Sequence, residues 1–466
     1  MIHDVSTFGA VGDGRTKDHP AIQAAINACA SQGGGVVTLP PGTYLAGTVY
    51  LKSHVCLDIQ PGAVLQASPD IADYNAPDFC PQNWSSVIEK TNGAHLIAAV
   101  EVHHVTLTGG GRIDGNRAAF FDPYACSRAQ FPGTRPAQML FFCESTHVRI
   151  ENLELTNSPY WTCFLHGCED AVLHGLTIVN DMKAWNADGL DIDACRRVTV
   201  SDCNITGADD AIAIRGNPRR LQDPTRACED ITVTNCILMT NQAAVRLGVG
   251  NGSVRRCCLS NLCIRGAGVG IDILSTYRDS SQSDRTARPK DYPDANAGTD
   301  VTDILFDNIF MQTKMPFDLV SNHYEAPQFH SAKLLRNITI RGVRGYGSMT
   351  SLFQGNHDLN LRNLALVDID LEYSGGEQIR LLQDGETCAQ RFAGFRPYAI
   401  YATNIDGFSL DRVRLAWGDL KGWLSGDTLW RKNYFKSATE RLNKAKAQVS
   451  MAELVEKPTI DQIKII

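Results

Sequence analysis

Three aspartates in two short segments could together perform acid and base chemistry. Asp188 lies in an Asn-Ala-Asp-Gly segment, and Asp209 and Asp210 end a Gly-Ala-Asp-Asp segment. When Leu190 and Ile212 are aligned as inward-facing strand positions, Asp188 falls level with Asp210. Neighbouring strands lie about 4.8 Å apart, so we expect the three carboxylates to meet at one turn.

A cluster of this kind suits the hydrolysis of a glycosidic bond. Like charges at short range repel each other and raise the pKa of at least one carboxyl. A protonated carboxyl can then act as general acid, while ionised ones activate water. Two alternatives stay open from the residues alone. Each aspartate could bond a backbone N–H in a turn, and the three oxygens together could hold Ca²⁺.

Further polar residues are expected beside the cluster on the outward face of the same strands. Alternation along the strands places Asp191, Arg246 and Asp272 outward, with Asp193 facing Arg215 one step further. Facing Asp and Arg side chains can bind neutral sugar hydroxyls. The alternative is a surface ladder of ion pairs, each worth about 0–1 kcal/mol.

Aromatic residues near the cluster could contact a sugar ring. Trp161 falls level with Asp188 one coil earlier in the chain, because Cys168 aligns with Cys195. A packing role for Trp161 fits equally well. Trp185 is a looser candidate for substrate binding. His166, His174 and His323 are isolated in the sequence, and most of them are expected to have structural or surface roles.

A short repeat predicts the elements that position these residues. The pattern is apolar-x-apolar, two mostly polar or small residues, and apolar-x-apolar, and clear copies start at Val148, Ala171, Val198 and Ile231. These starts are 23, 27 and 33 residues apart, and weaker copies follow as far as Phe408. Period-two strands without intervening helices exclude βαβ folding. Such units bury their apolar faces only by stacking coil on coil, as in an all-β parallel solenoid.

The sixth position of the repeat should form one inward column. Its members, in chain order, are Leu153, Leu176, Cys203, Cys236, Leu262, Ile309, Val343, Ile369 and Val413.

The ends of a solenoid need covers, because they expose unpaired strand edges. Residues 18–31 begin with Asp and an early Pro and stop at three glycines, which predicts an N-terminal helical cap. We expect a catalytic β-helix over 1–420 and a capping or wrapping segment over 421–466, with a helix at 437–449. Insertions at 115–138, 281–300 and 376–400 are candidates for loops that wall a cleft.

Composition indicates a folded globular protein and excludes several partners. Of the 466 residues 43% are hydrophobic and 20% charged, and 44 Lys and Arg against 51 Asp and Glu give a net charge of −7. This balance lacks the basic footprint of a nucleic-acid binder. No run of about 18 apolar residues predicts a membrane span. The first residues show no secretory signal pattern, so we expect a cytoplasmic protein.

Fifteen cysteines without a short spacing framework are expected to be reduced core residues rather than disulfides or metal ligands. We predict no cofactor and no metal site. The sequence makes no prediction of oligomeric state.

Several motifs in combination resemble the polygalacturonase family of glycoside hydrolases, family 28. They are Phe8-Gly-Ala-Val-Gly-Asp-Gly14, Gly33-Gly-Gly-Val-Val-Thr-Leu-Pro-Pro-Gly-Thr-Tyr44, Asn157-Ser-Pro-Tyr-Trp161 and the two aspartate segments, and the similarity runs from about residue 4 to residue 415. The resemblance implies a single-stranded right-handed parallel β-helix of the pectin-lyase-like type and hydrolysis with inversion. It also implies that Asp209 is the general acid and that Asp188 and Asp210 position and deprotonate the attacking water.

The chain departs from the family pattern where a uronate carboxylate would bind. A family histidine aligns with Ala243, and the family's Arg-Ile-Lys aligns with Gly270, Ile271 and Asp272. An aspartate would repel a carboxylate that a cation would hold. We therefore expect a neutral or modified sugar beside the cleaved bond.

The resulting hypothesis is an inverting, exo-acting glycoside hydrolase of plant-type, pectin-related oligosaccharides. Two alternatives remain: a β-helix lyase or epimerase of uronates, and a non-catalytic carbohydrate-binding solenoid. Loss of the cations argues against the first alternative, and retention of all three aspartates argues against the second.

Overall fold

The structure is a computed structural model in which the chain forms two compact units. The described residues are 1–87, 91–120, 135–275, 277–278, 296–321, 333–356, 358–373, 399–417 and 463–465. Those up to Ile237 form the first unit, and those from Leu238 onward form the second. Among the described helices, none has the length and apolar character needed to cross a bilayer.

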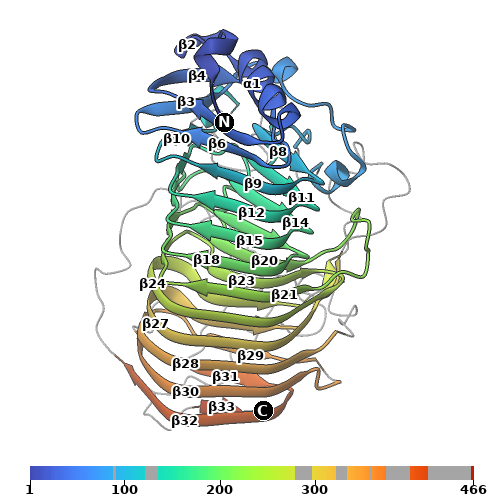
Figure 1. The fold of residues 1–466 in the computed structure, drawn as a ribbon. Coiled ribbons are helices and arrows are strands. Elements are labelled where there is room, and N and C mark those ends of the chain that lie inside the picture. The colour runs from blue at the N-terminus through green and yellow to red at the C-terminus, as the bar shows by residue number, and fades with distance from the viewer. Residues whose placement is uncertain are drawn as a thin grey trace, which may run out of the picture. The chain divides into compact units, whose positions relative to one another are not determined.

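The first unit stacks short parallel strands in three series, one strand of each series per coil (Figure 1). One series is β5 (Val49–Tyr50), β8 (Ile97–Val100), β11 (Leu140–Cys143), β14 (Cys163–His166), β17 (Leu190–Asp193) and β20 (Ile212–Gly216). The second is β1 (Ile2–Asp4), β3 (Gly35–Leu39), β6 (Val55–Ile59), β9 (His103–Thr108), β12 (Thr146–Glu151), β15 (Glu169–His174), β18 (Arg196–Ser201) and β21 (Cys228–Thr234). The third is β2 (Asp13–Lys17), β4 (Gly42–Ala46), β7 (Ala63–Ala67), β10 (Arg112–Asp114), β13 (Glu154–Thr156), β16 (Thr177–Val179) and β19 (Asn204–Thr206), and β22 (Ile237–Met239) begins at the last residue of the unit.

The predicted repeats correspond to consecutive strands of the second and third series. The turn between these strands contains one residue in the left-handed region, with φ of 56° at Asn152, 63° at Gly175, 58° at Asp202 and 56° at Asn235. Only Gly, Asn and Asp adopt this conformation at little steric cost. The repeat therefore has small or polar residues at this place, because the turn between the two strands needs a residue in the left-handed conformation. The prediction of an all-β right-handed parallel β-helix is confirmed.

The inward column predicted from the sixth repeat position is buried, with one exception. Cys203 and Cys236 are 2% and 1% exposed and act as small core residues. Val413 is paired with the preceding member of the column, Ile369, but is only half-buried. It lies on β32 (Ile405–Trp417), the last strand of its series among the described residues, so no further described strand pairs onto it there. The thirteen cysteines in the described part of the chain are free thiols.

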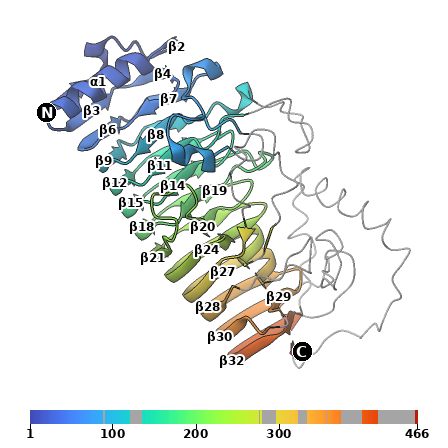
Figure 2. The same cartoon turned by 90° about the vertical axis from the view of Figure 1, so that its right-hand side faces the viewer.

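The predicted N-terminal cap is helix α1 (His19–Ser31), which lies at the N-terminal end of the first unit (Figure 2). Its buried face includes Ile22, Ile26 and Cys29. The carboxylate of Asp18, just before the helix, accepts hydrogen bonds from the backbone of Val11 (2.7 Å) and Gly12 (3.1 Å). Short 3₁₀ helices occur at η1 (Val5–Phe8), η2 (Ile71–Asp73), η3 (Pro81–Ser85) and η4 (Arg117–Ala119).

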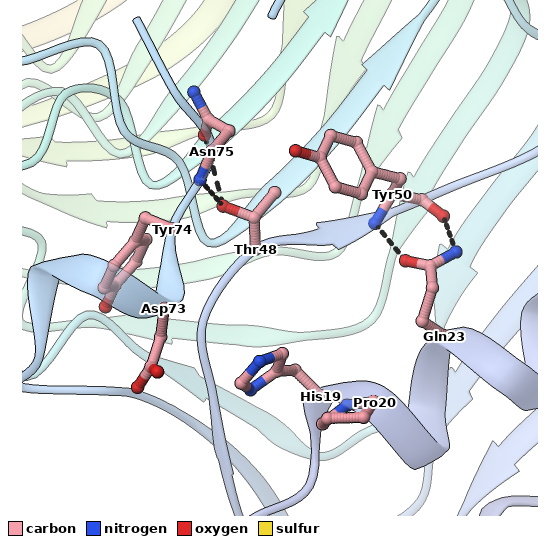
Figure 3. Close-up of a pocket in the computed structure, with 8 residues that line it drawn as sticks. All are labelled: His19, Pro20, Gln23, Thr48, Tyr50, Asp73, Tyr74 and Asn75. Atoms are coloured by element: carbon pink, nitrogen blue, oxygen red, sulfur yellow. Dashed lines mark hydrogen bonds between the residues drawn. The ribbon is translucent and has the colours of Figure 1, made fainter.

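A pocket lies beside this cap, and hydrogen bonds join several of its lining residues (Figure 3). The Gln23 amide donates to the carbonyl of Tyr50 (3.0 Å) and accepts from its N–H (2.8 Å), so the helix satisfies the backbone of strand β5. Thr48 Oγ1 accepts from the N–H of Asn75 (2.8 Å) and donates to the carbonyl of His95 (2.6 Å). The Gln23 contacts thus hold the cap on strand β5, and the Thr48 contacts join the first coils to one another.

The second unit contains longer parallel strands. They are β23 (Ala243–Gly250), β24 (Ser253–Leu274), β27 (Asp300–Val320), β28 (Leu335–Gly347), β29 (Ser351–Gln354), β30 (Leu361–Tyr373), β31 (Ile400–Thr403), β32 and β33 (Ile463–Ile465), and a separate antiparallel pair joins β25 (Tyr277–Arg278) to β26 (Asn296–Ala297). Several predictions lie outside the described residues: most of the three cleft-wall insertions, the boundary at residue 420 and the helix at 437–449.

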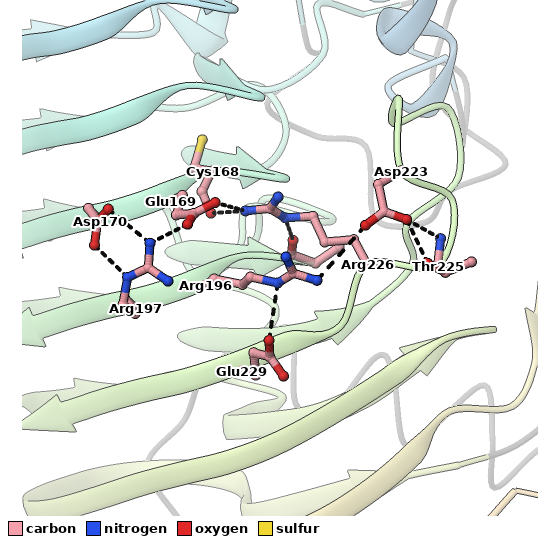
Figure 4. A network of polar contacts seen from close by, with 10 residues as sticks. Cys168, Glu169, Asp170, Arg196, Arg197, Asp223, Thr225, Arg226 and Glu229 are labelled. Carbon is pink, nitrogen blue, oxygen red and sulfur yellow. Dashed lines mark hydrogen bonds and ion pairs between the residues drawn. The ribbon is translucent and has the colours of Figure 1, made fainter.

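An ion-pair network covers part of the outer surface of the first unit (Figure 4). Arg226 binds Glu169 with an Nη2 to Oε2 distance of 3.0 Å, and Arg197 contacts both Glu169 and Asp170. These pairs join the corners of successive coils. Exposed pairs contribute little individually, about 0–1 kcal/mol, so the stability of the coils depends mainly on the buried columns.

Candidate active site

The three aspartates identified in the sequence meet in the first unit. Strands β17 and β20 pair with Leu190 opposite Ile212, the register that the sequence predicted. One carboxylate oxygen from each of Asp188, Asp209 and Asp210 lies within 4.8 Å of the other two. Asp188 and Asp210 are each 3% exposed, whereas Asp209 is half-buried. The predicted carboxylate cluster is therefore present, with Asp209 as its most accessible member.

Gly189 fixes the position of Asp188 against the next coil. Its N–H donates to the carbonyl of Asp210 (2.9 Å), which ties the two segments together. A Cβ at residue 189 would lie 2.4 Å from the carbonyl oxygen of Ala211 and 2.5 Å from the Ile205 side chain. No side chain fits there, so the glycine serves the close approach of the two coils.

Burial and like charge act together on Asp188. Desolvation is the larger cause, and the nearby Asp191, Asp209 and Asp210 add to it, so the pKa of the Asp188 carboxyl lies well above its usual value. Arg215 opposes this shift. Among the described residues, none donates a hydrogen bond to Asp188 Oδ1. The cluster thus favours the protonated form of Asp188 more than water around an isolated aspartate does.

A residue that the sequence did not indicate orients the third carboxylate. Asn186 Nδ2 donates to Asp209 Oδ2 (3.3 Å), and Arg135 Nη2 donates to Asn186 Oδ1 (2.8 Å). The Arg135 guanidinium lies 4.5 Å from the ring centre of Tyr160 and also donates to the carbonyl of Trp185 (2.8 Å). Arg135 is almost completely buried, and it lies in the insertion at 115–138, which the sequence indicated only as a candidate cleft-wall loop.

Arg215 lies over Trp161, the aromatic residue predicted either to contact a sugar ring or to pack. Its guanidinium is 4.4 Å from the ring centre of Trp161, within cation–π range. It is 3.5 Å from Asp191 and 4.0 Å from Asp193, measured between the nearest charged atoms. Trp161 is 5% exposed and stacks on Tyr160 with ring centres 5.0 Å apart. This geometry favours the packing role for Trp161. Asp191 has no exposed surface, and burial raises the pKa of its carboxyl although Arg215 opposes the shift.

A buried pair lies beside Arg215. His166 Nδ1 is 3.7 Å from Asp193 Oδ2, and His166 Nε2 contacts the carbonyl of Arg219 at 3.0 Å. Burial lowers the pKa of His166 to about 4, so this histidine is neutral. Burial raises the pKa of Asp193 to about 7, although Arg215 and the N–H of Asn217 oppose the shift. His166 therefore has the structural role expected of it.

Two of the predicted substrate-binding residues lie in the second unit. Arg246 and Asp272 are paired across β23 and β24, and their nearest charged atoms are 3.1 Å apart. Ala243, at the position of the family histidine, is fully buried. Sugar binding by Arg246, Asp272 and the half-buried Trp185 stays a prediction.

The carboxylate cluster also has the donor set of a hard-cation site. Ca²⁺ binds carboxylate oxygens at about 2.3–2.6 Å and takes six to eight ligands. Three oxygens within 4.8 Å of one another could supply part of such a shell. Acid and base catalysis and cation binding would use the same three carboxylates. The effect of removing divalent cations on activity distinguishes the two roles.

Comparison with known proteins decides the family. A model described as "Glycosyl hydrolases family 28" matches residues 78–383. The chain belongs to this family. A second model, "Rhamnogalacturonase A/epimerase, pectate lyase-like", matches residues 2–57. A "Probable polygalacturonase" of Vitis vinifera is 25% identical over 346 residues, which are 66% of this chain and 69% of that protein.

Solved structures share the fold of this family 28 chain. An exopolygalacturonase from Thermotoga maritima superposes with a TM-score of 0.59 at 16% identity, covering 82% of this chain and 89% of the other. A family 28 exopolygalacturonase from Yersinia enterocolitica gives 0.58 at 17% identity, covering 90% and 78%. Family membership makes the protein a glycoside hydrolase, which argues against the lyase and the non-catalytic solenoid among the hypotheses above.

Proposed function

We propose that this glycoside hydrolase cleaves pectin-related oligosaccharides at the carboxylate cluster, with inversion at the anomeric carbon. The observation that carries the proposal is the meeting of Asp188, Asp209 and Asp210, whose nearest carboxylate oxygens lie within 4.8 Å of one another. Asp209, the most exposed of the three, gives its proton to the leaving oxygen as the glycosidic bond breaks. Asp188 and Asp210 hold the attacking water and accept its proton.

A proton shared among the three carboxyls is compatible with these roles. Three carboxyls this close titrate as one system, and the proton that they share belongs to the cluster rather than to one residue. The hydrogen bond from Asn186 orients Asp209, while Asp188 and Asp210 lie deeper. Hydrolysis moves one proton from Asp209 to the leaving group and returns one from water to the cluster, so the protonation state is restored after each turnover.

Stereochemistry is the first test of this proposal. In two-carboxylate sites, separations of about 6.5–9.5 Å accompany inversion and about 5–5.5 Å accompany retention. A cluster of three allows two carboxylates to share the water while the third reaches the leaving group, so its short spacing does not dictate retention. Proton NMR during the first minutes of hydrolysis should show product of inverted anomeric configuration. A product of retained configuration contradicts the proposed roles.

A neutral or modified sugar beside the cleaved bond is the second part of the proposal. Arg215 lies near Asp191 and Asp193, and Arg246 is paired with Asp272. Arg246, whose guanidinium lies 3.1 Å from the Asp272 carboxylate, gains less from a substrate carboxylate than a cation without an acidic neighbour would. The same Asp–Arg pairs offer both donors and acceptors, which suits sugar hydroxyls.

Exo action is the third part of the proposal. Relatives named exopolygalacturonase include proteins of Zea mays and Platanus acerifolia, 21% and 23% identical over about four-fifths of this chain, besides the two structures above. An exo-acting enzyme should release one mono- or disaccharide from the start of the reaction, whereas endo action produces a ladder of intermediate lengths.

The deciding experiment compares two sets of oligosaccharides with the wild-type protein. One set is oligogalacturonides, and the other carries neutral or modified sugars at the chain end. We expect faster cleavage of the second set, measured as kcat/KM from product chromatography. Preference for unmodified oligogalacturonides would refute the proposed specificity while leaving the glycosidase activity intact.

A further inference from the structure

A cluster of exposed histidines lies on the first unit, on coils before those of the carboxylates. His54 precedes strand β6, and His103 and His104 begin strand β9. One ring nitrogen from each of the three lies within 4.8 Å of the other two. The His54 N–H donates to the carbonyl of His103 (3.0 Å), so the backbone fixes the two corners relative to each other.

Stacking of the coils places the histidine side chains in a ladder. Strand register sets His54 level with His104, because Cys56 pairs with Thr106, and it sets His147 level with His104 as well. The ring centres of His54 and His104 are 5.2 Å apart, and those of His104 and His147 are 4.4 Å apart. All three have positive φ, of 64°, 55° and 53°. This conformation is uncommon for a residue with a side chain, and it repeats here at the same corner of successive coils.

We propose that His54, His103 and His104 bind a divalent transition metal such as Zn²⁺. Imidazole nitrogen is a preferred ligand for Zn²⁺, Cu²⁺ and Ni²⁺. Two nitrogens bound to one tetrahedral Zn²⁺ at about 2.05 Å lie about 3.3 Å apart. The Nδ1 atoms of His103 and His104 are 3.3 Å apart, which matches this edge. Water or the neighbouring His147 would complete the shell.

The column of corner residues that contains His54, His104 and His147 continues on the next coil. Level with His147 on the next coil is Asp170, whose carboxylate is bound by Arg197 at 2.7 Å (Figure 4). The column of histidine side chains thus ends at His147, and the ion pair between Asp170 and Arg197 occupies the same position on the next coil.

A metal at this site would join two successive coils. His54 belongs to the coil of β6, and His103 and His104 belong to the coil of β9. A ligand that binds only the folded chain raises the free energy of unfolding as its concentration exceeds its dissociation constant. The site is therefore a structural clamp near the N-terminal end of the first unit, with no part in the hydrolytic step.

The test is a titration of the full chain with Zn²⁺ at pH 7.5 by calorimetry, after dialysis against a chelator. We expect one Zn²⁺ per chain at this site and a higher thermal midpoint when it is bound. His103→Ala and His54→Ala should each weaken binding at least about tenfold, since even loss of outer-shell partners costs 10–100-fold. His174→Ala, a half-exposed histidine paired with Asp202 outside the cluster, is the matched control and should bind as wild type does.

Cys56 provides a second control. Its thiol is half-buried two residues after His54, so among the described cysteines it is the nearest in sequence to a proposed ligand. Cys56→Ser should leave the affinity unchanged, and bound Co²⁺ should give a visible tetrahedral spectrum without a thiolate charge-transfer band. Absence of binding, equal binding by His103→Ala and wild type, or loss of binding in Cys56→Ser would overturn the proposal. His103→Gln, with unchanged circular dichroism, separates ligand loss from misfolding.

Discussion

Asp193 should make the protein less stable as the pH rises through neutrality. Its carboxyl is 2% exposed and its pKa is raised to about 7, chiefly by burial. In the unfolded chain the same group has a pKa of about 3.9. Between these two values the folded state binds more protons than the unfolded state, so stability is greatest below pH 4 and falls as the pH approaches 7.

The size of the effect follows from the shift. About three pKa units at about 1.4 kcal/mol each give an upper limit of about 4 kcal/mol, of which about 3 kcal/mol is lost between pH 5 and pH 8. Asp193→Asn mimics the protonated carboxyl. Its carbonyl can still accept from the N–H of Asn217, which now lies 2.7 Å from Asp193 Oδ1, and its amide can donate to the neutral His166.

Urea unfolding at pH 5, 6, 7 and 8 measures this contribution. Asp193→Asn should be more stable than wild type at pH 8, and the difference should shrink by about 3 kcal/mol at pH 5. Asp78→Asn, at an exposed position, is the control for the change in charge and should follow the wild-type curve. Equal pH slopes for Asp193→Asn and wild type, or destabilisation at pH 8, would refute the reasoning.

Three further predictions concern the carboxylate cluster. Gly189→Ala should destabilise the protein by about 1–3 kcal/mol in urea unfolding, because its Cβ would lie 2.4 Å from the Ala211 carbonyl oxygen; unchanged stability would contradict the tight fit. Arg135→Met should lower kcat more than it raises KM, since Arg135 orients Asp209 only through Asn186, and an effect on KM alone would argue against this role. Dialysis against EDTA should leave hydrolysis unchanged, whereas loss of activity restored by Ca²⁺ would indicate that the cluster holds a cation.

Much of the fold could be predicted because the residue types at each turn are determined by the local backbone conformation. A left-handed residue is needed at each turn, so Asn152, Gly175, Asp202 and Asn235 mark the coils in the sequence. The same periodicity fixes the register of β17 against β20 and thereby the meeting of Asp188 with Asp210. Local pattern and stacking geometry are sufficient for these features.

The rest of the site depends on contacts that no periodicity encodes. Arg135 lies within the insertion at 115–138 and reaches Asn186 across a large sequence separation. Alternation predicted that Arg215 would face Asp193, but its guanidinium leans towards Asp191 and covers Trp161. Side-chain direction at a buried charged position is set by the surrounding packing, which sequence spacing does not describe.

The role of Asp209 as general acid is the central claim, and leaving-group dependence tests it most directly. The measurement compares kcat of wild type, Asp209→Asn and Asp188→Asn on an oligosaccharide that wild type cleaves and on the dinitrophenyl glycoside of the same sugar. Asp209→Asn should lose about 10²–10⁴-fold on the oligosaccharide and recover most of its rate on the activated glycoside, whose leaving group needs no proton. Asp188→Asn should stay slow on both substrates, because water activation is still required. Near-wild-type cleavage of the oligosaccharide by Asp209→Asn, or equal losses on both substrates, would contradict the account.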